Sequence, residues 1–514
     1  MSRNARRRGR KERLSQSETQ DDALSVWPGV VGGRFKPLAP AEVDLIEEAA
    51  LTLLETLGLS QAIPSMIEMV CGAGGELSSE GRLLFPRDLV RQSVKEAHRR
   101  FHLRGQRPEH DLKIDHARVH TSTGGAAPGI FDIDTGEYRE STLADLYDSA
   151  RLVDAMENIH HFSRPVVARD VEDNCAMDLN TAYACLTGTA KHVSISITEA
   201  ANVRPIADLC YAIAGDEAAF RARPFMTVLV CHVVPPMRFA EEACEVLEEA
   251  IRAGFPVQLI SAGQAGATSP ATISGSLAQA VAETLAGLVF ARLVDPGVMA
   301  IFAPKPLVAD LRTGSMSGGG GEQAILMAAA AQMGRHFDLP TSSIAGITDS
   351  KTLDAQYGAE KSLAVALAAH AGSNIITQAA GSHASLLAVS LEGYVSDNDL
   401  LGNILRTVRG VEATPENIAA DVITNVCQGP GHYLGETHTF DRMKSDYFYP
   451  VAGDRRSPSD WADDGARPIG DVAREKARAV LGTHFPTHID DATDRALRER
   501  FDIRLSRARI GRDA

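Results

Sequence analysis

The feature that most constrains the fold is an alternation of short apolar runs with helical segments, which repeats between residues 118 and 378. Eight apolar runs are predicted strands: Arg118–Ser122, Ile159–Val167, His192–Thr198, Phe225–His232, Pro256–Ser261, Val298–Ala303, Ser342–Ile347 and Asn374–Gln378. Helical patterns between them include 143–155, 200–213, 239–253, 274–293, 322–337 and 359–371. Such alternation predicts parallel strands joined by right-handed crossovers. The run 225–230 is apolar on both faces, as is typical of a buried parallel strand.

Eight strands without a dinucleotide-binding fingerprint favour an α/β fold of the TIM (β/α)8 barrel type over an open α/β sheet, which remains the alternative. The chain has 514 residues. That length exceeds a typical domain, but α/β barrels often form one large unit. The 43 glycines and the aromatic content of 5% also suit an α/β protein with many tight turns.

The sequence divides into four predicted segments. Residues 1–36 form a basic disordered tail, and residues 37–115 form an N-terminal helical region, because apolar residues recur at helical spacing there. The barrel occupies residues 116–390. Residues 391–514 are expected to form C-terminal helices and an extended tail, since the chain is polar and rich in prolines and charges from about Arg455.

Charge and cysteine usage restrict the partners and the compartment. The net charge of −15 argues against nucleic acid or an anionic membrane as a partner, because phosphate binding needs a basic surface. The sequence has no stretch of about 18 uncharged apolar residues, so no membrane-spanning helix is predicted. The N-terminus lacks the apolar core of a secretory signal. Seven cysteines without a Cys-x-x-Cys pair indicate free thiols in a reducing cytoplasm. Cysteine and histidine do not cluster at the spacing of a metal site.

Candidate site residues follow from the barrel, because its active site lies where strands end and βα loops begin. The predicted catalytic residues are Asp349, Lys351 and His383. The predicted substrate-binding residues are Gly124, Glu199, His232, Gln264, Lys305, Gln356 and Gln378. Neither a phosphate-binding loop of the G-x-x-x-x-G-K-[ST] type nor an H-E-x-x-H zinc helix is present in the sequence.

Each candidate has a structural alternative. Glycine at 124 suits a turn, Glu199 suits a helix N-terminus, and His232 beside Val233 suits a core histidine. Lys305 stands between two prolines and is alternatively a solvent-facing lysine, while Asp349 and Lys351 are alternatively a local ion pair. The glycine run 318–321 is either an anion cradle at a helix N-terminus or a flexible loop.

Several ordered motifs between Val233 and Tyr449 resemble the trimethylamine methyltransferase family. They are V234-P-P-M-R-F, G266-A-T-S-P-A-T-I-S-G, A282-E-T-L-A-G, L311-R-T-G, T348-D-S-K with Asp354 and Gln356, S390-L-E, G429-P-G and E436-T-H-T. The arginine-rich start also resembles the family. The sequence departs from the family's pattern at 308–311 and in the loop 381–385, where the substrate is expected to bind.

The resemblance implies a barrel enzyme that moves a methyl group from a methylated amine to the cobalt of a corrinoid protein. The founding members use pyrrolysine, whereas this sequence has only the standard amino acids. Relatives without pyrrolysine include glycine betaine methyltransferases, so a quaternary amine is favoured. A quaternary nitrogen already carries a neutral leaving amine, so cobalt(I) can attack in line once the methyl is oriented and water is excluded.

The same resemblance implies no tightly bound cofactor and no metal, because the corrinoid (cobalamin) arrives on a partner protein that docks over the barrel mouth. It also implies a homo-oligomer. A betaine carboxylate would require donors such as His383, Lys305 or Gln264, and Tyr357, Tyr394 and Phe131 are candidate aromatic contacts for the ammonium. The alternatives are a tertiary methylamine methyltransferase, a non-catalytic barrel that binds methylated amines, and a Schiff-base lyase or aldolase that uses Lys305 or Lys351.

Overall fold

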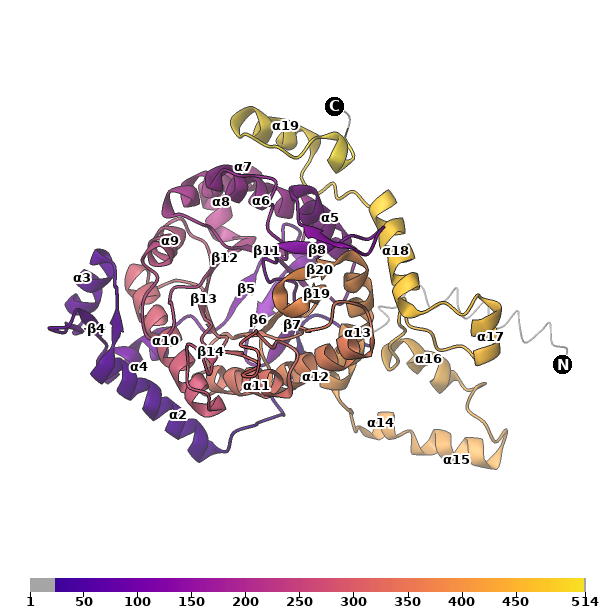
Figure 1. Ribbon diagram of the computed structural model, residues 1–514. Helices are drawn as coiled ribbons and strands as arrows, with labels where there is room; N and C mark the ends of the chain where they lie inside the picture. The colour runs from indigo at the N-terminus through magenta and orange to yellow at the C-terminus, as the bar shows by residue number, and fades with distance from the viewer. Residues whose placement is uncertain (1–23, 513–514) are drawn as a thin grey trace.

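The centre of the computed structural model, which describes residues 24–512, is a ring of parallel strands seen along its axis in Figure 1. The strands are β7 (Arg118–Thr121), β10 (His161–Ser163), β11 (His192–Ile195), β12 (Met226–Val230), β13 (Val257–Ser261), β15 (Ala300–Pro304), β17 (Ser342–Ile344) and β18 (Ile375–Thr377). Parallel ladders run from β10 to β15 and from β17 through β18 to β7. Single bridges, Ser122–His161 and Phe302–Thr341, close the ring. The predicted TIM barrel is therefore confirmed, and each strand overlaps one predicted run.

Helices cover the outside of this ring (Figure 1). They are α5 (Leu143–Asp154), α6 (Asn174–Gly188), α7 (Val203–Ala214), α8 (Glu217–Ala222), α9 (Glu241–Arg252), α10 (Ile273–Val294), α11 (Gly321–His336), α12 (Ala355–Ala371) and α13 (Leu391–Arg409). The outward residues of the strands, such as Val228 and Leu259, are fully buried against them. Inward residues alternate with outward ones along each strand, and the inward set forms the lumen.

A hairpin closes the N-terminal end of the barrel. Its strands, β5 (Phe101–Leu103) and β6 (Leu112–Ile114), pair antiparallel. Four of their apolar side chains pack against Ile301 of β15 and Ile375 of β18 in one buried cluster. Apolar packing therefore fills this end of the barrel.

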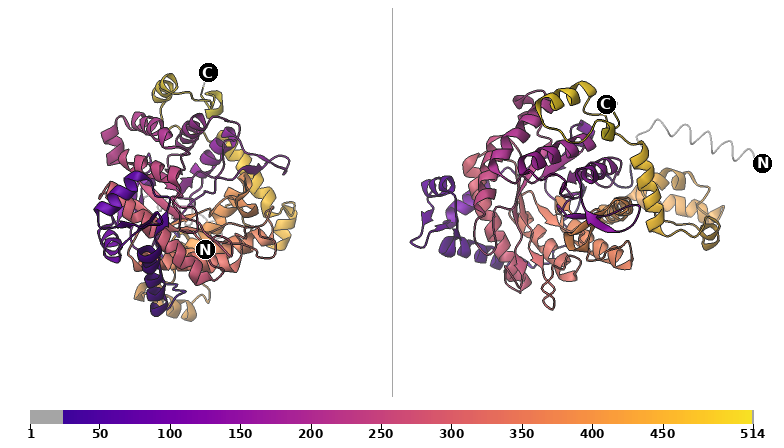
Figure 2. Two further views of the ribbon diagram at one scale, coloured as in Figure 1. Left: turned by 60° about the vertical axis from the view of Figure 1, so that its left-hand side comes forward. Right: turned by 45° about the horizontal axis from the view of Figure 1, so that its top comes forward.

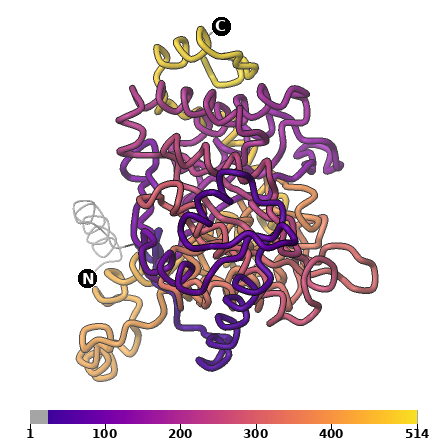
Figure 3. Tube along the Cα trace, turned by 90° about the vertical axis from the view of Figure 1, so that its left-hand side faces the viewer, coloured from indigo at the N-terminus to yellow at the C-terminus, as the bar shows by residue number. Residues whose placement is uncertain are grey.

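The N-terminal region packs on the outside of the barrel against α10, and Figure 3 shows it in indigo in front of the barrel. It contains α2 (Pro40–Thr52), a π-helical turn (Leu53–Leu57), α3 (Pro64–Gly72) and α4 (Arg87–Glu96). It also contains a three-stranded sheet, β2 (Leu59–Ser60), β4 (Arg82–Leu84) and β3 (Glu76–Leu77), which helical periodicity did not predict. Within residues 24–512, α10 is the one helix long and apolar enough to span a membrane, and 89% of its apolar window is buried.

The C-terminal segment is helical and packs back onto the barrel (Figures 1 and 2). Helix α18 (Ile469–Thr483) lies on α13 and α5, and α19 (Asp491–Arg500) lies on α7. The predicted extended tail beyond Arg455 is therefore wrong. Its charged residues are partly structural: the buried carboxylate of Asp494 accepts hydrogen bonds from Tyr183, Arg498 and Arg507, which anchors this end to α6.

Two short stretches complete the chain. Helices α14 (Pro415–Ile418) and α15 (Ala420–Gln428) lie away from the barrel in Figure 1. Helix α16 (Thr437–Ser445) returns to α13, where Arg409 donates to the backbone oxygen of Ser445. Residues 24–36, predicted to belong to a disordered tail, instead pack on the barrel: β1 (Val30–Val31) pairs antiparallel with β7, and Arg409 lies 5.2 Å from the centroid of Trp27. The rest of that predicted tail, residues 1–23, lies outside the described residues.

Candidate active site

The end of β12 shows which side chains face the lumen. Thr227 points inward, because its hydroxyl lies 2.8 Å from Nε2 of His192 on the next strand. Alternation then directs Cys231 inward, and Cys231 is exposed although it ends a central strand. The cysteine therefore faces open space at the mouth. Cys231 was not among the predicted site residues, because a cysteine that follows an apolar run is typical of a free thiol in the protein core.

His232 points the opposite way. Its Nε2 lies 2.9 Å from the carbonyl oxygen of Glu283 on α10, and a Cβ placed on Gly287 of the same helix would lie 2.3 Å from that nitrogen. The ring is fully buried between β12 and α10. The predicted substrate contact of His232 is therefore wrong, and the alternative of a core histidine is correct.

Lys305, directly after β15, crosses the lumen. Its Nζ donates to Oε1 of Gln258 on β13 (2.8 Å) and to Oγ1 of Thr377 on β18 (2.9 Å). The side chain is 3% exposed, so the alternative of a solvent-facing lysine is wrong. Burial lowers the pKa of Lys305 to about 7, and the nearby Cys231 thiol opposes that shift.

Strands β7 and β18 bring a second group together beside Lys305. Gly124 and Gly125 have φ values of +142° and +119°, which glycine adopts more readily than other residues. A Cβ on Gly124 would lie 3.1 Å from the end of the Gln378 side-chain amide and 3.3 Å from Oγ of Ser163. The N–H of Gly125 donates to the Gln378 amide oxygen (3.0 Å) when that amide is oriented to satisfy both of its ends. Two predicted residues, Gly124 and Gln378, thus meet at the mouth together with Ser163, which was missed.

Gln264 and Glu199 lie higher on the barrel wall. Gln264 is half-buried in β14 (Gln264–Ala265), which pairs in parallel with β16 (Leu307–Val308) and extends the wall above β13 and β15. Glu199 is exposed after β11, and its Oε1 accepts a hydrogen bond from Asn174 (3.0 Å). Both residues are therefore at the rim rather than beside Lys305.

Asp349 connects three loops at the mouth. Its carboxylate accepts hydrogen bonds from the backbone N–H of Gly318 (2.8 Å), from Ser317 Oγ (3.1 Å) and from Ser385 Oγ (2.5 Å). The glycine run therefore does cradle an anion, and that anion is the protein's own Asp349. The contacts of Asp349 position loops, and they do not place a catalytic carboxylate beside Lys305.

The neighbours of Asp349 in the sequence also have local partners. Lys351 is exposed, and its Nζ donates to the backbone oxygen of Asp349 (2.6 Å), so the side-chain ion pair considered for these two residues is absent. Gln356 donates to Glu360 (2.8 Å), which in turn accepts from Thr348 and from the Asp349 N–H. The structure thus has Lys351 in the loop after β17 and Gln356 in the first turn of α12.

His383 lies in a buried network behind the loop that follows β18. Its Nε2 is 2.9 Å from Ser390 Oγ, and its ring centroid is 4.6 Å from that of Tyr357. Burial and the Lys361 ammonium lower the pKa of His383 to about 3, so the ring is neutral. Tyr357 in turn donates to Asp397 (2.6 Å). His383 is 1% exposed, which suits a structural support for the loop and contradicts the prediction of a catalytic histidine.

The candidate aromatic contacts do not form a cage around the lumen. Tyr357 and Tyr394 are 2% and 0% exposed, and Phe131 packs edge-on against His383. Within residues 24–512, His, Cys, Asp and Glu form no group that could hold a metal ion. The lumen instead offers neutral polar groups, one amine and one thiol.

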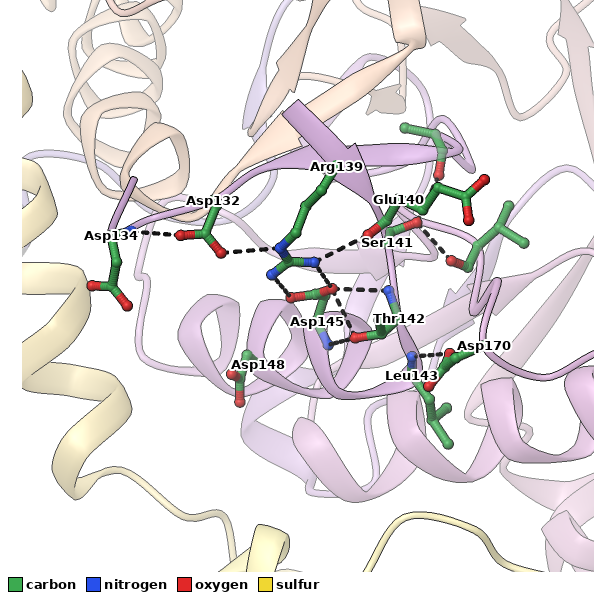
Figure 4. Close-up of polar contacts among 12 residues, drawn as sticks. Asp132, Asp134, Arg139, Glu140, Ser141, Thr142, Leu143, Asp145, Asp148 and Asp170 are labelled. Carbon is green, nitrogen blue, oxygen red and sulfur yellow. Dashed lines mark hydrogen bonds and ion pairs between the residues drawn. The ribbon is translucent and has the colours of Figure 1, made fainter. Parts of the chain in front are cut away.

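A hairpin follows β7, and Figure 4 shows the polar contacts that hold it. Its strands, β8 (Gly129–Phe131) and β9 (Tyr138–Glu140), join β20 (Ala388–Ser390) and β19 (Ser382–His383) in one sheet. Arg139 holds the hairpin to the start of α5 through two hydrogen bonds to Asp145, of 2.7 and 2.8 Å. Asp145 also caps α5 with Thr142. The loops after the first and last strands are thereby fixed to each other and to α5.

Comparison with known proteins gives one consistent result. The sequence profile of the family described as "Trimethylamine methyltransferase (MTTB)" matches residues 6–508. The chain is 28% identical to the trimethylamine methyltransferase MttB of Desulfitobacterium hafniense, over 89% of this chain and 91% of that protein. It is 27% identical to a glycine betaine methyltransferase of the same species, over 90% and 96%.

Two further comparisons also cover most of the chain. Identity to the trimethylamine methyltransferase MttB of Methanosarcina barkeri is 30%, over 92% of this chain and 95% of that protein. Among solved structures, the Methanosarcina barkeri monomethylamine methyltransferase (MtmB) is 14% identical, with a TM-score of 0.47 over 88% of this chain and 96% of that one. The chain is a methyltransferase that belongs to the trimethylamine methyltransferase family.

Proposed function

We propose that this enzyme transfers a methyl group from a small, betaine-like quaternary amine to the cobalt(I) of a corrinoid carried by a partner protein. The observation that carries the proposal is a polar lumen that is closed by apolar packing at one end and opens at the other. A methylated amine in that lumen presents its methyl group towards the mouth, where a partner protein can dock. The family and its relatives supply the reaction class.

A quaternary amine suits the chemistry of this lumen. The leaving group is already a neutral amine, so the reaction needs no acid to activate it. The protein's task is to hold the cation, align one methyl with the incoming cobalt(I) and exclude water. We assign substrate contacts to Gly124, Gln378 and Lys305 in the lumen and to Gln264 at the rim, and we assign to Glu199, also at the rim, the attraction of the cation.

The partners follow from the same proposal. The corrinoid is a co-substrate that arrives on another protein, and no cofactor is bound tightly by this chain. We also propose a cytoplasmic homo-oligomer. A tertiary methylamine is the alternative substrate, and a barrel that binds the amine without demethylating it is the non-catalytic alternative.

One specific observation favours a second candidate function. Lys305 is buried, and its pKa of about 7 leaves part of its amine neutral near neutral pH, as a Schiff-base lyase requires. Borohydride trapping with carbonyl substrates distinguishes the two functions. Covalent labelling of Lys305 supports the lyase, and its absence with a wide carbonyl panel rejects it.

Product analysis tests the proposed function. The purified protein is incubated with its corrinoid partner in the cobalt(I) state and with glycine betaine, proline betaine, carnitine, choline or trimethylamine. Proton NMR then follows the loss of one N-methyl group. We expect demethylation of at least one quaternary amine, in proportion to the corrinoid supplied. Intact substrates throughout, with a corrinoid partner shown to accept methyl groups, would reject the proposal.

A further inference from the structure

Three lysines of the described chain are buried, and Lys305 differs from the other two. The Nζ of Lys191 donates to three backbone carbonyl oxygens at 2.5–2.7 Å. Lys361 forms an ion pair with Asp397 (3.1 Å) inside the loop-supporting network. Lys305 has two neutral acceptors, Gln258 and Thr377. An ammonium group has three N–H donors, so one donor of protonated Lys305 remains unused.

Gln258 supplies a second unused donor at the same place. Its side chain is fully buried, and its Oε1 accepts the hydrogen bond from Lys305. Its Nε2 has no hydrogen-bond partner among residues 24–512. A buried amide N–H without a partner costs about 1–3 kcal/mol. Two donors, one of them on a cation, therefore lie side by side in the lumen without acceptors.

The protein supplies no negative charge to match Lys305. None of the ion pairs within residues 24–512 includes it, and Cys231 is the one ionisable neighbour that raises its pKa. Other carboxylates of the barrel are engaged elsewhere: Asp349 binds the glycine loop, and Glu283 accepts from Met237 N and Ser261 Oγ outside the lumen. A ligand that is only a cation would add a like charge to this site.

We propose that Lys305 and Gln258 form a carboxylate-binding subsite at the floor of the lumen, so that the substrate is a zwitterion with its quaternary ammonium towards the mouth. This inference rests on the proposed function, and it specifies which quaternary amines react. The carboxylate accepts the third N–H of Lys305 and the Nε2 hydrogen of Gln258. It thereby fixes the direction of the substrate, with the N-methyl groups near Gly124 and Gln378, where an acceptor can reach them.

Matched ligand pairs test the subsite by calorimetry. Glycine betaine is compared with choline, and proline betaine with N,N-dimethylpyrrolidinium, which lacks the carboxylate. A hydrogen bond to a charged group contributes about 1.5–3 kcal/mol, so we expect about 10- to 150-fold tighter binding of at least one carboxylated ligand. Lys305→Met and Gln258→Met should remove that preference, whereas the exposed Lys95→Met should retain it. Equal binding within every pair, or an unchanged preference in Lys305→Met, would overturn the subsite.

A second measurement uses the unmodified protein, because Lys305→Met alters a buried site. The protein is treated with a small acylating reagent that reacts with amines, and peptide mass spectrometry measures the acylation of Lys305. The carboxylated ligand should protect Lys305 and its matched cation should not. Protection by both or by neither would contradict the subsite. If the preference and the protection are observed but no amine is demethylated, the methyl-transfer proposal fails and the subsite stands. If an amine is demethylated without any preference for carboxylated ligands, the subsite fails and the methyl-transfer proposal stands.

Discussion

At the scale of single residues, the direction of each side chain on a strand decides whether it reaches the lumen. Cys231 and His232 are adjacent, yet one faces open space and the other packs against Gly287. Ile301 faces inward, because it packs on the hairpin that closes the barrel. Side chains alternate along a strand, so Ala303 and then Lys305 also face the lumen. The polar character of the lumen thus comes from a few inward positions.

Binding of a carboxylated quaternary amine should weaken as the pH rises. The carboxylate binds the protonated amine, so affinity is fully present below the pKa of Lys305, about 7, and is lost above it. We expect up to a tenfold rise in Kd per pH unit between pH 7 and 9, measured by calorimetry. Lys305→Arg, which stays charged, should flatten the profile. A flat profile in the unmodified protein would contradict a role for this amine.

Gly124→Ala should reduce activity more than stability. At a φ of +142°, an added Cβ lies 3.1 Å from Gln378 and 3.3 Å from Ser163, so the side chains at the mouth must shift. We expect the kcat for demethylation to fall at least about tenfold, since small misplacements at a reacting centre are costly. Gly136→Ala, in the exposed β8–β9 turn with open space around it, is the control. Retention of full activity by Gly124→Ala would show that this glycine does not shape the site.

Sequence patterns predicted all eight strands from the alternation of short apolar runs with helical segments. They did not predict α6, whose buried Asp178, Asn180 and Thr181 weaken its apolar stripe. They placed Lys305, Gly124 and Gln378 at the mouth by position after a strand, and the structure has these residues close to the lumen. They predicted a substrate contact for His232, although alternation from Thr227 directs it outward, and they did not single out Gln258, because nothing local distinguishes a glutamine inside a strand.

At the scale of elements, three loops of the mouth are joined by one carboxylate. Asp349 lies in the loop after β17. Its carboxylate accepts hydrogen bonds from Gly318 N–H in the loop after β15 and from Ser385 Oγ in the loop after β18. Residues 384–386 all have positive φ, a conformation that costs about 1–2 kcal/mol per non-glycine residue. The backbone N–H groups of Ala384 and Ser385 donate hydrogen bonds to backbone oxygens in the loop after β17, and these bonds hold that turn.

Asp349→Asn should loosen these loops. The amide retains fewer acceptors for Gly318 N–H and Ser385 Oγ, so we expect a loss of about 1–3 kcal/mol in the free energy of unfolding. Hydrogen exchange should accelerate in residues 317–320 and 383–387. Asp310→Asn, on an exposed turn with Arg312, should change neither quantity. Unchanged exchange in Asp349→Asn would show that the loops hold their positions without this carboxylate.

At the scale of the whole molecule, the C-terminal segment is part of the folded body. Helices α18 and α19 pack on α13, α5 and α7 (Figure 2), and charged residues make several of the contacts. The polar composition beyond Arg455 predicted an extended tail, whereas the structure has helices held by buried ion pairs. Composition alone does not distinguish these cases, because the partners of Asp494 lie both close by in the sequence and more than 300 residues away.

Asp494→Asn should release the C-terminal helices. Its carboxylate is buried between Arg498 (3.1 Å) and Arg507 (2.6 Å), and removing one member of a buried charge cluster costs about 3–5 kcal/mol. We expect faster limited proteolysis between α18 and the C-terminus. The exposed Asp502, which pairs with Arg504 outside this cluster, provides the control, Asp502→Asn. Equal cleavage of the two variants would show that this cluster does not anchor the segment.

The most direct measurement is the absorption spectrum of the corrinoid during turnover. The protein is mixed anaerobically with its corrinoid partner as cobalt(I) and with one carboxylated quaternary amine from the matched pairs. Methyl transfer predicts conversion of the cobalt(I) spectrum to that of methyl-cobalt(III), at a rate that depends on both this enzyme and the amine. A cobalt(I) spectrum that persists with every amine, while the same partner accepts methyl groups from another donor, would contradict the proposed reaction.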